Sequence, residues 1–307
     1  MYTYSIVIPH KNTPKLLQRC LNSIPYRDDI QIIIIDDDSD SSYVDFKKFP
    51  GYNRKNVEIY FTKEGKGVGY ARNIGLQKAK GKWLLFADSD DFFNPNFLNA
   101  LDKYKDSTEE IIYYLASSVE SNTLQKSTRH LYLLKTRKKY YKKFRYNKIK
   151  AKDQLIYKNW EVWAKMFNRN FIEKNNLIFD EERIGEEALF VIKAGELSKN
   201  YSVDDFPLYC ITYRKDSLCF SLDNENDFDE RFMAKTRINT YLKKVKKDKF
   251  TIDLDKDLLE SYNYGGATKM KEIMKIIKNN GNKIRLKTYI KYYIRTVYNP
   301  KIKMYLF

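Results

Sequence analysis

Cysteine is scarce in this chain of 307 residues, which contains only Cys20, Cys210 and Cys219. So sparse and odd a set does not make the disulfide framework that stabilises small secreted domains. A metal site built on these three thiols is not expected either. The cysteine content therefore predicts a reducing compartment.

Long apolar runs are missing as well. No stretch of the sequence approaches the roughly 18 to 20 apolar residues that a transmembrane helix requires. The N-terminal segment MYTYSIVIPH lacks the basic and then apolar layout of a secretory signal peptide. Together these features predict a cytoplasmic protein.

Positive charge and tyrosine are present in excess. The formal net charge is +17, the chain contains 26 tyrosines, and 43% of its residues are hydrophobic. This length and apolar content suffice for one large domain or two small ones with a buried core. The charge indicates contact with something anionic, such as phosphate groups, nucleic acid or a membrane surface.

Short apolar segments alternate with helical patterns over the first 120 residues. The predicted strands are YSIVIP, IQIIIID, VEIYFT, KWLLFAD and EIIYYLASS. Segments of this kind, without polar alternation, are typical of strands covered on both faces of a parallel sheet. Between the first two, Thr13 as N-cap and Pro14 in the first turn predict the start of a helix. The pattern predicts a layered α/β fold.

Acidic residues stand directly behind two of these strands. Asp36 and Asp37 close one strand, and Asp88, Asp90 and Asp91 follow another. Ligands of parallel sheets bind outside the carboxyl ends of the strands, so both groups are expected at the ligand edge. Clustered carboxylates repel one another unless a cation compensates them, which indicates a divalent metal ion.

Solvated or helix-capping turns are the alternative interpretation of both acidic segments. In DDDSDSS a calcium-binding loop is excluded, because Ser41 replaces the glycine and Lys47 the glutamate that such a loop requires. In DSDD the position directly behind a buried strand favours a functional role.

A glycine-rich segment, KGVGYARNIGLQKAKGKW, separates the two acidic groups. Its first glycines loosen the backbone before a helix whose small residues suit close packing on the sheet. It matches neither the dinucleotide-binding nor the P-loop glycine pattern. Lys66 and Arg72 are expected to direct their charge toward the loop edge.

Four segments, taken in order, resemble segments of the family-2 glycosyltransferases, which have the GT-A fold. They are SIVIPHKN, IIIIDDDSD, GVGYARNIGLQKAKGKWLLFADSDD and IGEEALF. The resemblance is strong over residues 3 to 100, moderate from 155 to 221 and weak beyond. It implies a Rossmann-like, mostly parallel central sheet with flanking helices.

The resemblance also implies a division of the chain. Residues 1–221 are expected to form the GT-A catalytic domain, with a nucleotide-binding half over 1–120 and an acceptor-side half over 121–221. Residues 222–307 are expected to form a helical, basic C-terminal region.

For the nucleotide-sugar donor, the resemblance implies a set of contacting residues. Pro9 ends the first strand, and Asp37, with Asp36, would accept hydrogen bonds from the base. Arg72 would lie beside the nucleotide and its diphosphate, and Arg214 in YRKDS would contact a phosphate. The donor implied is a nucleotide-diphosphate sugar, with UDP as the expected nucleotide.

The segment DSD resembles the D-x-D motif of that family. Asp88 would reach the ribose, and Asp90, together with Asp88, would hold a Mn²⁺ or Mg²⁺ that bridges both phosphates. Hard oxygen ligands combined with substrate phosphates are the coordination that such ions favour. Asp91 would support this group on the acceptor side.

The segment GEEALF supplies the implied general base. Glu187 matches the base position of the family and Glu186 precedes it, which implies a single inverting displacement. The alternative is a solvated first helical turn favoured by the helix dipole. Trp163 and Phe167 either line the acceptor side or belong to the core.

Two positions depart from the family pattern. Lys11 stands where the family often has an aromatic residue, so stacking on the base is not implied there. Asp38 stands where glycine or asparagine is common. Neither change removes a metal ligand or the candidate base.

Basic residues gather at two places outside the nucleotide half. Residues 129–152 contain eleven Lys and Arg among aromatic residues. In the tail, two apolar sets recur at helical spacing: Met270, Ile273, Met274 and Ile277, and Ile290, Tyr293, Ile294 and Val297. Each set either packs on the protein or lies on an anionic membrane, which would make the protein peripheral to the inner face of that membrane.

The sequence therefore predicts a metal-dependent, inverting hexosyltransferase that uses a saccharide or lipid-linked acceptor in cell-surface polysaccharide synthesis. A sugar-phosphate nucleotidyltransferase is the nearest rival, but IPHKNTP is not the glycine-rich loop that it requires. A basic nucleic-acid-binding protein is the other, although no segment resembles a known nucleic-acid module.

Overall fold

The computed structural model describes residues 1–128, 130–214 and 224–298. The chain divides into two compact units between Lys215 and Asp216, and each unit is described by itself. The boundary predicted at residues 221 and 222 lies outside the described residues, as do Cys219 and the end of YRKDS. The two halves predicted within the catalytic domain share one sheet.

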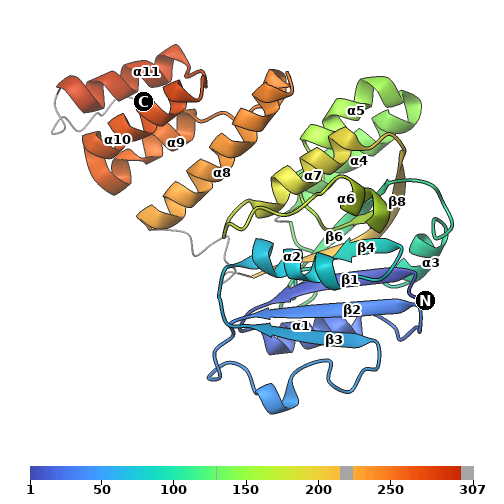
Figure 1. The fold of residues 1–307 in the computed structure, drawn as a ribbon. Helices are drawn as coiled ribbons and strands as arrows, with labels where there is room; N and C mark the ends of the chain where they lie inside the picture. The colour runs from blue at the N-terminus through green and yellow to red at the C-terminus, as the bar shows by residue number, and fades with distance from the viewer. Residues whose placement is uncertain (129, 215–223, 299–307) are drawn as a thin grey trace. The chain divides into compact units, whose positions relative to one another are not determined.

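Unit 1 is built on an eight-stranded sheet in the order β3-β2-β1-β4-β7-β6-β8-β5 (Figure 1). The strands are β1 (Tyr4–His10), β2 (Ile30–Asp37), β3 (Val57–Thr62), β4 (Trp83–Phe86), β5 (Phe92–Phe93), β6 (Ile111–Glu120), β7 (Lys165–Asn168) and β8 (Tyr201–Tyr213). The first four strands are parallel, β7 runs antiparallel to β4 and β6, and β8 is parallel to β6 and antiparallel to β5. The predicted α/β fold and all five predicted strands are confirmed.

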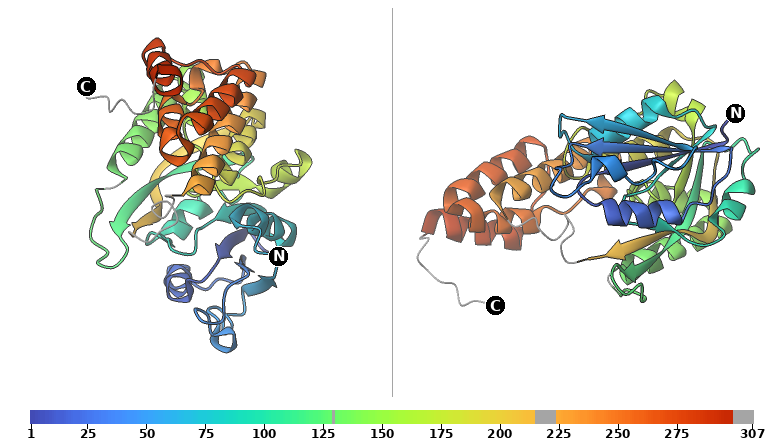
Figure 2. Two further views of the ribbon diagram at one scale, coloured as in Figure 1. Left: turned by 90° about the vertical axis from the view of Figure 1, so that its left-hand side faces the viewer. Right: turned by 90° about the horizontal axis from the view of Figure 1, so that it is seen from below.

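Helices cover both faces of this sheet. They are α1 (Pro14–Asn22), α2 (Val68–Lys78), α3 (Phe97–Asp102), α4 (Leu131–Tyr146), α5 (Lys148–Tyr157), α6 (Arg169–Lys174) and α7 (Glu186–Leu197), with a short 3-10 turn, η1 (Phe46–Lys48). Alternate residues of β1 point to opposite faces: Ile6 belongs to the cluster that contains Leu17 of α1, and Val7 to the cluster that contains Ala71 of α2. α1 and α2 therefore lie on opposite sides of the strands (Figure 2).

Close packing of α2 on β1 depends on a glycine, as the small-residue face predicts. A Cβ at Gly75 would lie 2.2 Å from Cγ1 of Val7. Thr13 is the N-cap residue of α1 and Pro14 begins its first turn, as predicted. The Thr13 side chain makes no capping bond, and its hydroxyl lies 3.3 Å from that of Ser89. β3, at the edge of the sheet, was expected to be covered on both faces, but its residues are only partly buried and Phe61 is exposed.

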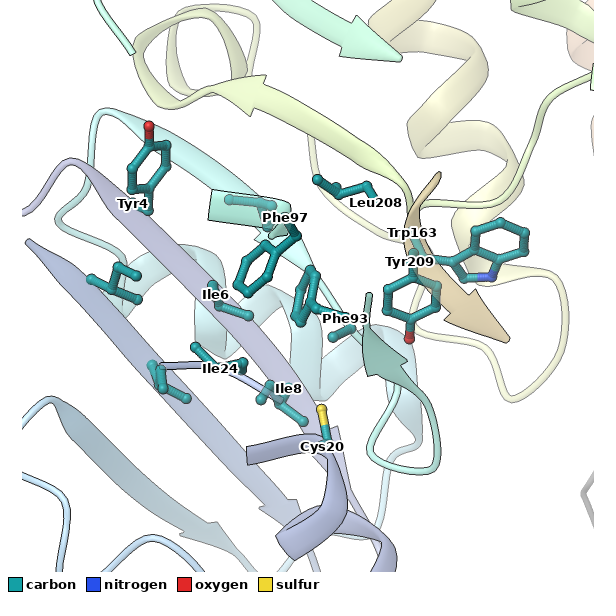
Figure 3. Packing of buried hydrophobic residues seen from close by; sticks show 14 of the residues in the cluster. Tyr4, Ile6, Ile8, Cys20, Ile24, Phe93, Phe97, Trp163, Leu208 and Tyr209 are labelled. Carbon is teal, nitrogen blue, oxygen red and sulfur yellow. The ribbon is translucent and has the colours of Figure 1, made fainter. Parts of the chain in front are cut away.

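Aromatic side chains fill the core beside β5 and β8 (Figure 3). The rings of Phe93 and Phe97 stack at 4.4 Å between centroids, and those of Trp163 and Tyr209 at 5.6 Å. Cys20 is buried in the same cluster as a free thiol. This core holds β5, the strand that follows the DSDD segment, against β8.

Unit 2 is helical. It contains α8 (Glu225–Lys244), the 3-10 turn η3 (Asp248–Phe250), α9 (Asp255–Glu260), α10 (Tyr262–Asn279), α11 (Leu286–Tyr293) and a π-helical turn, η4 (Ile294–Tyr298). Its own core contains the predicted face of α10 together with residues of α8 and α9: Phe228, Phe232, Leu254, Leu258, Met270, Ile273, Met274 and Ile277. The predicted helical C-terminal region is confirmed. Throughout the described ranges, every helix falls short of the length and apolar character that crossing a membrane needs.

Candidate active site

Both acidic segments stand at one edge of the sheet, as the sequence predicts. β1 pairs in parallel with β2 and with β4, so the carboxyl ends of the three strands lie together. In this register His10 stands opposite Asp36, and Val7 stands opposite Phe86, two residues before Asp88. The fold thus brings the two carboxylate groups to the ligand edge of a parallel sheet.

Asp36 is buried and held by its neighbours. The Thr13 amide donates to Nε2 of His10 over 3.1 Å, so Nδ1 carries the proton and donates to Asp36 over 2.6 Å. Ser39 adds bonds from its hydroxyl and its amide. Burial alone would raise the pKa of Asp36, but these hydrogen bonds outweigh it and lower that pKa. Asp36 therefore orders the loop, with His10 and Ser39 as partners that the sequence did not reveal.

Asp37 joins two parts of the predicted nucleotide site. Its carboxylate accepts hydrogen bonds from the hydroxyl of Thr62 over 2.9 Å and from the amide of Gly67 over 2.7 Å. Gly67 has φ of 93°, a conformation that favours glycine. Each carboxylate oxygen has a second lone pair, so Asp37 can still accept a bond from a base. Pro9 is buried in β1 opposite Ile35, so its part is to shape the strand.

Arg72 links the DSDD segment to the GEEALF segment across a long sequence separation. From α2, its guanidinium donates to Asp88 over 2.7 Å and to Glu186 over 2.5 Å, and Glu186 lies 114 residues away along the chain. The Arg72 side chain is 3% exposed, whereas that of Asp88 is 35% exposed. A direct contact of Arg72 with a diphosphate would therefore require one of these ion pairs to open.

Asp90 is held in place by arginines from α1 and from the end of β8. Arg214 pairs with its carboxylate at 3.2 Å. Arg19 donates to its backbone carbonyl and to that of Ser121, and so fixes the DSDD turn. Burial and the nearby Asp88 raise the pKa of Asp90, and Arg214 only partly offsets them. A further cation beside Asp88 and Asp90 would relieve this repulsion.

Asp91, predicted to support this group on the acceptor side, turns its side chain inward toward β8. Its side chain is buried, and it accepts a hydrogen bond from the amide of Thr212 over 2.7 Å. Burial and the charges of Asp90 and Asp88 raise its pKa well above the ordinary value. Asp91 thus ties the turn to β8. It turns inward because the sheet passes directly beside it.

The carboxylates at this edge suit a hard divalent ion that is bound partly by the protein and partly by a substrate. The described residues include no group of three or more side chains able to complete a metal site by themselves. Asp88 and Asp90 nevertheless offer two partly exposed carboxylates on one turn. Mg²⁺ and similar ions commonly bind through one or two carboxylates together with substrate phosphates.

Glu187 is the second residue of α7 and has the properties of a poised base. Gly185, whose φ of 72° turns the chain into the helix, stands two positions before it. The Glu187 carboxylate accepts a hydrogen bond from the Val162 amide over 3.0 Å. Burial raises the pKa of Glu187 to about 8; Arg72 opposes this rise, and the charges of Glu186 and Asp88 add to it. Glu186, in contrast, is buried against Arg72.

Trp163 belongs mainly to the core, which was one of its two predicted roles. Its ring stacks on Tyr209 (Figure 3), and the Arg137 guanidinium lies 4.4 Å from its centroid. Phe167 is fully buried in β7. Arg137 in turn pairs with Glu161.

Lys165 completes a buried charged group near Glu187 that sequence patterns do not reveal. Its ammonium contacts the carbonyl of Glu161 and lies 3.4 Å from the side-chain oxygen of Asn159. Burial, together with the nearby charge of Arg137, lowers the pKa of Lys165 to about 7. Asn159, Glu161 and Lys165 stand within seven positions of the sequence, at the connection from α5 into β7, yet nothing in their spacing predicts a cluster.

Comparison with known proteins identifies relatives among bacterial glycosyltransferases. The glycosyltransferase GlyA of Streptococcus pneumoniae is 28% identical over 70% of this chain and 31% of its own length. The putative glycosyltransferase EpsH of Bacillus subtilis is 25% identical, with 67% of this chain and 59% of its own length covered. The poly(ribitol-phosphate) beta-N-acetylglucosaminyltransferase TarS of Staphylococcus aureus is 24% identical over 81% of this chain and 43% of its own. The chain thus spans between about a third and three fifths of these relatives.

Solved structures share the fold. The crystal structure of S. aureus TarS residues 1–349 in complex with UDP-GlcNAc aligns with 94% of this chain and 78% of that one, at 19% identity and a TM-score of 0.59. The GT-A architecture expected from the sequence is thereby confirmed. The sequence profile described as glycosyl transferase family 2 matches residues 5–171, which is more than half of the chain. This protein belongs to glycosyl transferase family 2.

Proposed function

We propose that the protein transfers a hexosyl group from a nucleotide-diphosphate sugar, with UDP as the nucleotide, to a saccharide or lipid-linked acceptor in cell-surface polysaccharide synthesis. One observation carries the proposal: Arg72 joins the carboxylate at the end of β4 to the start of α7, where Glu187 stands. A phosphate-binding edge and a candidate base are thus parts of one site. Family membership favours this reaction over nucleotidyl transfer and nucleic-acid binding.

Asp90 and Asp88 would hold a Mn²⁺ or Mg²⁺ at the donor diphosphate. Such an ion stabilises the negative charge that develops on a departing diphosphate. The side chain of Arg214 pairs with Asp90, and that of Arg72 pairs with Asp88. The resident arginines therefore orient the ligands before the donor binds.

Glu187 would act as the general base in one inverting displacement. Its carboxylate takes the proton of the acceptor hydroxyl, whose oxygen forms the bond to the anomeric carbon while the bond to the diphosphate breaks. The nucleoside diphosphate leaves with the electron pair. The Val162 amide, which donates to Glu187, fixes the direction of the carboxylate.

The test is a screen of nucleotide sugars with the full chain, with and without Mn²⁺ or Mg²⁺. We expect a UDP-sugar to raise the melting temperature only when the metal is present, and its hydrolysis to be metal-dependent. Asp90→Ala should abolish the metal-dependent binding measured by calorimetry, whereas Asp106→Ala, an exposed acid on the same unit, should leave it unchanged. Equal affinity in Asp90→Ala would remove Asp90 from the metal site.

A further inference from the structure

α11 presents an apolar face to solvent. Leu286, Tyr289, Ile290 and Tyr293 follow one another at spacings of three, one and three residues, and they are 75%, 41%, 50% and 48% exposed. These spacings place all four on one side of a helix. The sequence pattern placed the apolar face further along, at Ile290, Tyr293, Ile294 and Val297. Ile290 and Tyr293 of the predicted face are exposed, and Leu286 and Tyr289 extend that face toward the start of the helix.

The other side of α11 is anchored to its own unit, so the exposed face has a fixed direction. Thr288 is buried and donates a hydrogen bond to Asp255 over 2.9 Å. Tyr292 packs on the unit 2 core. The helix is thus held by one side while large apolar side chains cover the other.

Positive charge borders this face. Lys287 and Lys291 belong to α11 itself, which contains no acidic residue. The ammonium of Lys278, on α10, lies 5.5 Å from the centroid of the Tyr289 ring. Among the described residues, neither Lys287 nor Lys291 has a carboxylate partner. Asp253 and Asp255 are both paired with Arg285, the residue just before α11.

From this arrangement we infer that α11 docks unit 2 on an anionic membrane surface. Leu286 and Ile290 enter the boundary between headgroups and acyl chains, and Lys287 and Lys291 contact lipid phosphates. A helix with an apolar face bordered by lysines has the character of an interfacial helix, and tyrosine favours the same depth. A second copy of this face would bring two sets of lysines together, which charge repulsion disfavours. The inference stands on unit 2 alone and does not depend on the proposed reaction.

Vesicle flotation of the full chain tests this inference. Binding is expected to vesicles that contain phosphatidylglycerol and to be weak on phosphatidylcholine alone. Leu286→Glu with Ile290→Glu, and separately Lys287→Glu with Lys291→Glu, should each lower partitioning at least about tenfold. Two matched controls are Ile178→Glu, an exposed isoleucine of unit 1, and Lys139→Glu with Lys142→Glu on α4. Both should bind as the parent does. Equal loss in the α4 variant would move the membrane contact to α4 and overturn the inference.

A spectroscopic measurement separates membrane contact from self-association. In an Ile290→Trp variant, tryptophan emission should shift to the blue on adding anionic vesicles, by more than the parent protein shows. Light scattering should give the same mass for the parent and for the Leu286→Glu, Ile290→Glu variant. A mass that halves in that variant, together with no vesicle binding by the parent, would assign the face to contact between copies. Circular dichroism of each variant establishes that unit 2 remains folded, and donor hydrolysis without vesicles should be unchanged.

Discussion

Glu187 offers the sharpest test of the site at the scale of one residue. Replacing it with glutamine keeps the size and the Val162 hydrogen bond but removes the ability to take a proton. We expect Glu187→Gln to bind the donor normally and to lower turnover by about a hundredfold or more. Release of nucleoside diphosphate measures the rate, and calorimetry measures binding. Glu196→Gln, at the other end of α7, is the matched control and should turn over normally. A nearly unchanged rate in Glu187→Gln would shift the role of base to another group.

The raised pKa of Glu187 predicts how the reaction depends on pH. A base is active when ionised, and burial raises this pKa to about 8. The value of kcat/KM should therefore rise with pH up to about 8 and then level off, whereas Glu187→Gln should lack this rise. A profile already flat from pH 6 upward would contradict the assignment.

The same pKa shift has a consequence for stability with a definite sign. In the folded protein Glu187 holds its proton up to about pH 8, whereas its ordinary pKa is 4.5. The folded state therefore binds more protons than the unfolded state between these values, so the wild type loses stability as pH rises through this window. Glu187→Gln does not ionise, and its stability relative to the wild type should increase over the same range in urea unfolding.

At the scale of elements, α2 depends on the contact between Gly75 and Val7. A methyl group at position 75 would lie 2.2 Å from a Val7 methyl, closer than atoms can approach. Gly75→Ala should destabilise unit 1 by about 1 to 3 kcal/mol, as overpacking does. Gln77→Ala, exposed on the same helix, should change stability by less than about 0.5 kcal/mol. Urea unfolding decides, and an unchanged midpoint in Gly75→Ala would mean that α2 can move away from β1.

The elements also mark what the sequence can reveal. Strands β1 to β4 were predictable because strands inside a layered fold have continuous apolar runs. The ends of these strands then locate Asp36 and Asp88 at the ligand edge. The ion pairs were not predictable, because Arg72 meets Glu186 and Arg19 meets the Asp90 backbone only after distant segments pack. The inward turn of Asp91 depends in the same way on β8. The sequence left open whether the α11 face is buried, because an exposed apolar face and a buried one have the same spacing.

At the scale of the whole molecule, each unit has a core of its own. The residues proposed for donor binding and base catalysis belong to unit 1, whereas the α10 face closes a separate core in unit 2. Two separate cores allow one unit to lose stability while the other keeps its structure. The proposed chemistry and the proposed membrane contact are thus assigned to different parts of the chain.

Met274→Ala tests this separation. The side chain is 3% exposed in the unit 2 core, and its truncation should cost about 2 to 5 kcal/mol there. Lys271→Ala, exposed on the same helix, should change stability by less than about 0.5 kcal/mol. Hydrogen exchange should show faster opening confined to unit 2 in Met274→Ala, while calorimetry should show the same affinity for the donor nucleotide as the wild type. Equal loss of protection in β1 and β2 would mean that the two cores unfold together, and the units would then form a single cooperative structure.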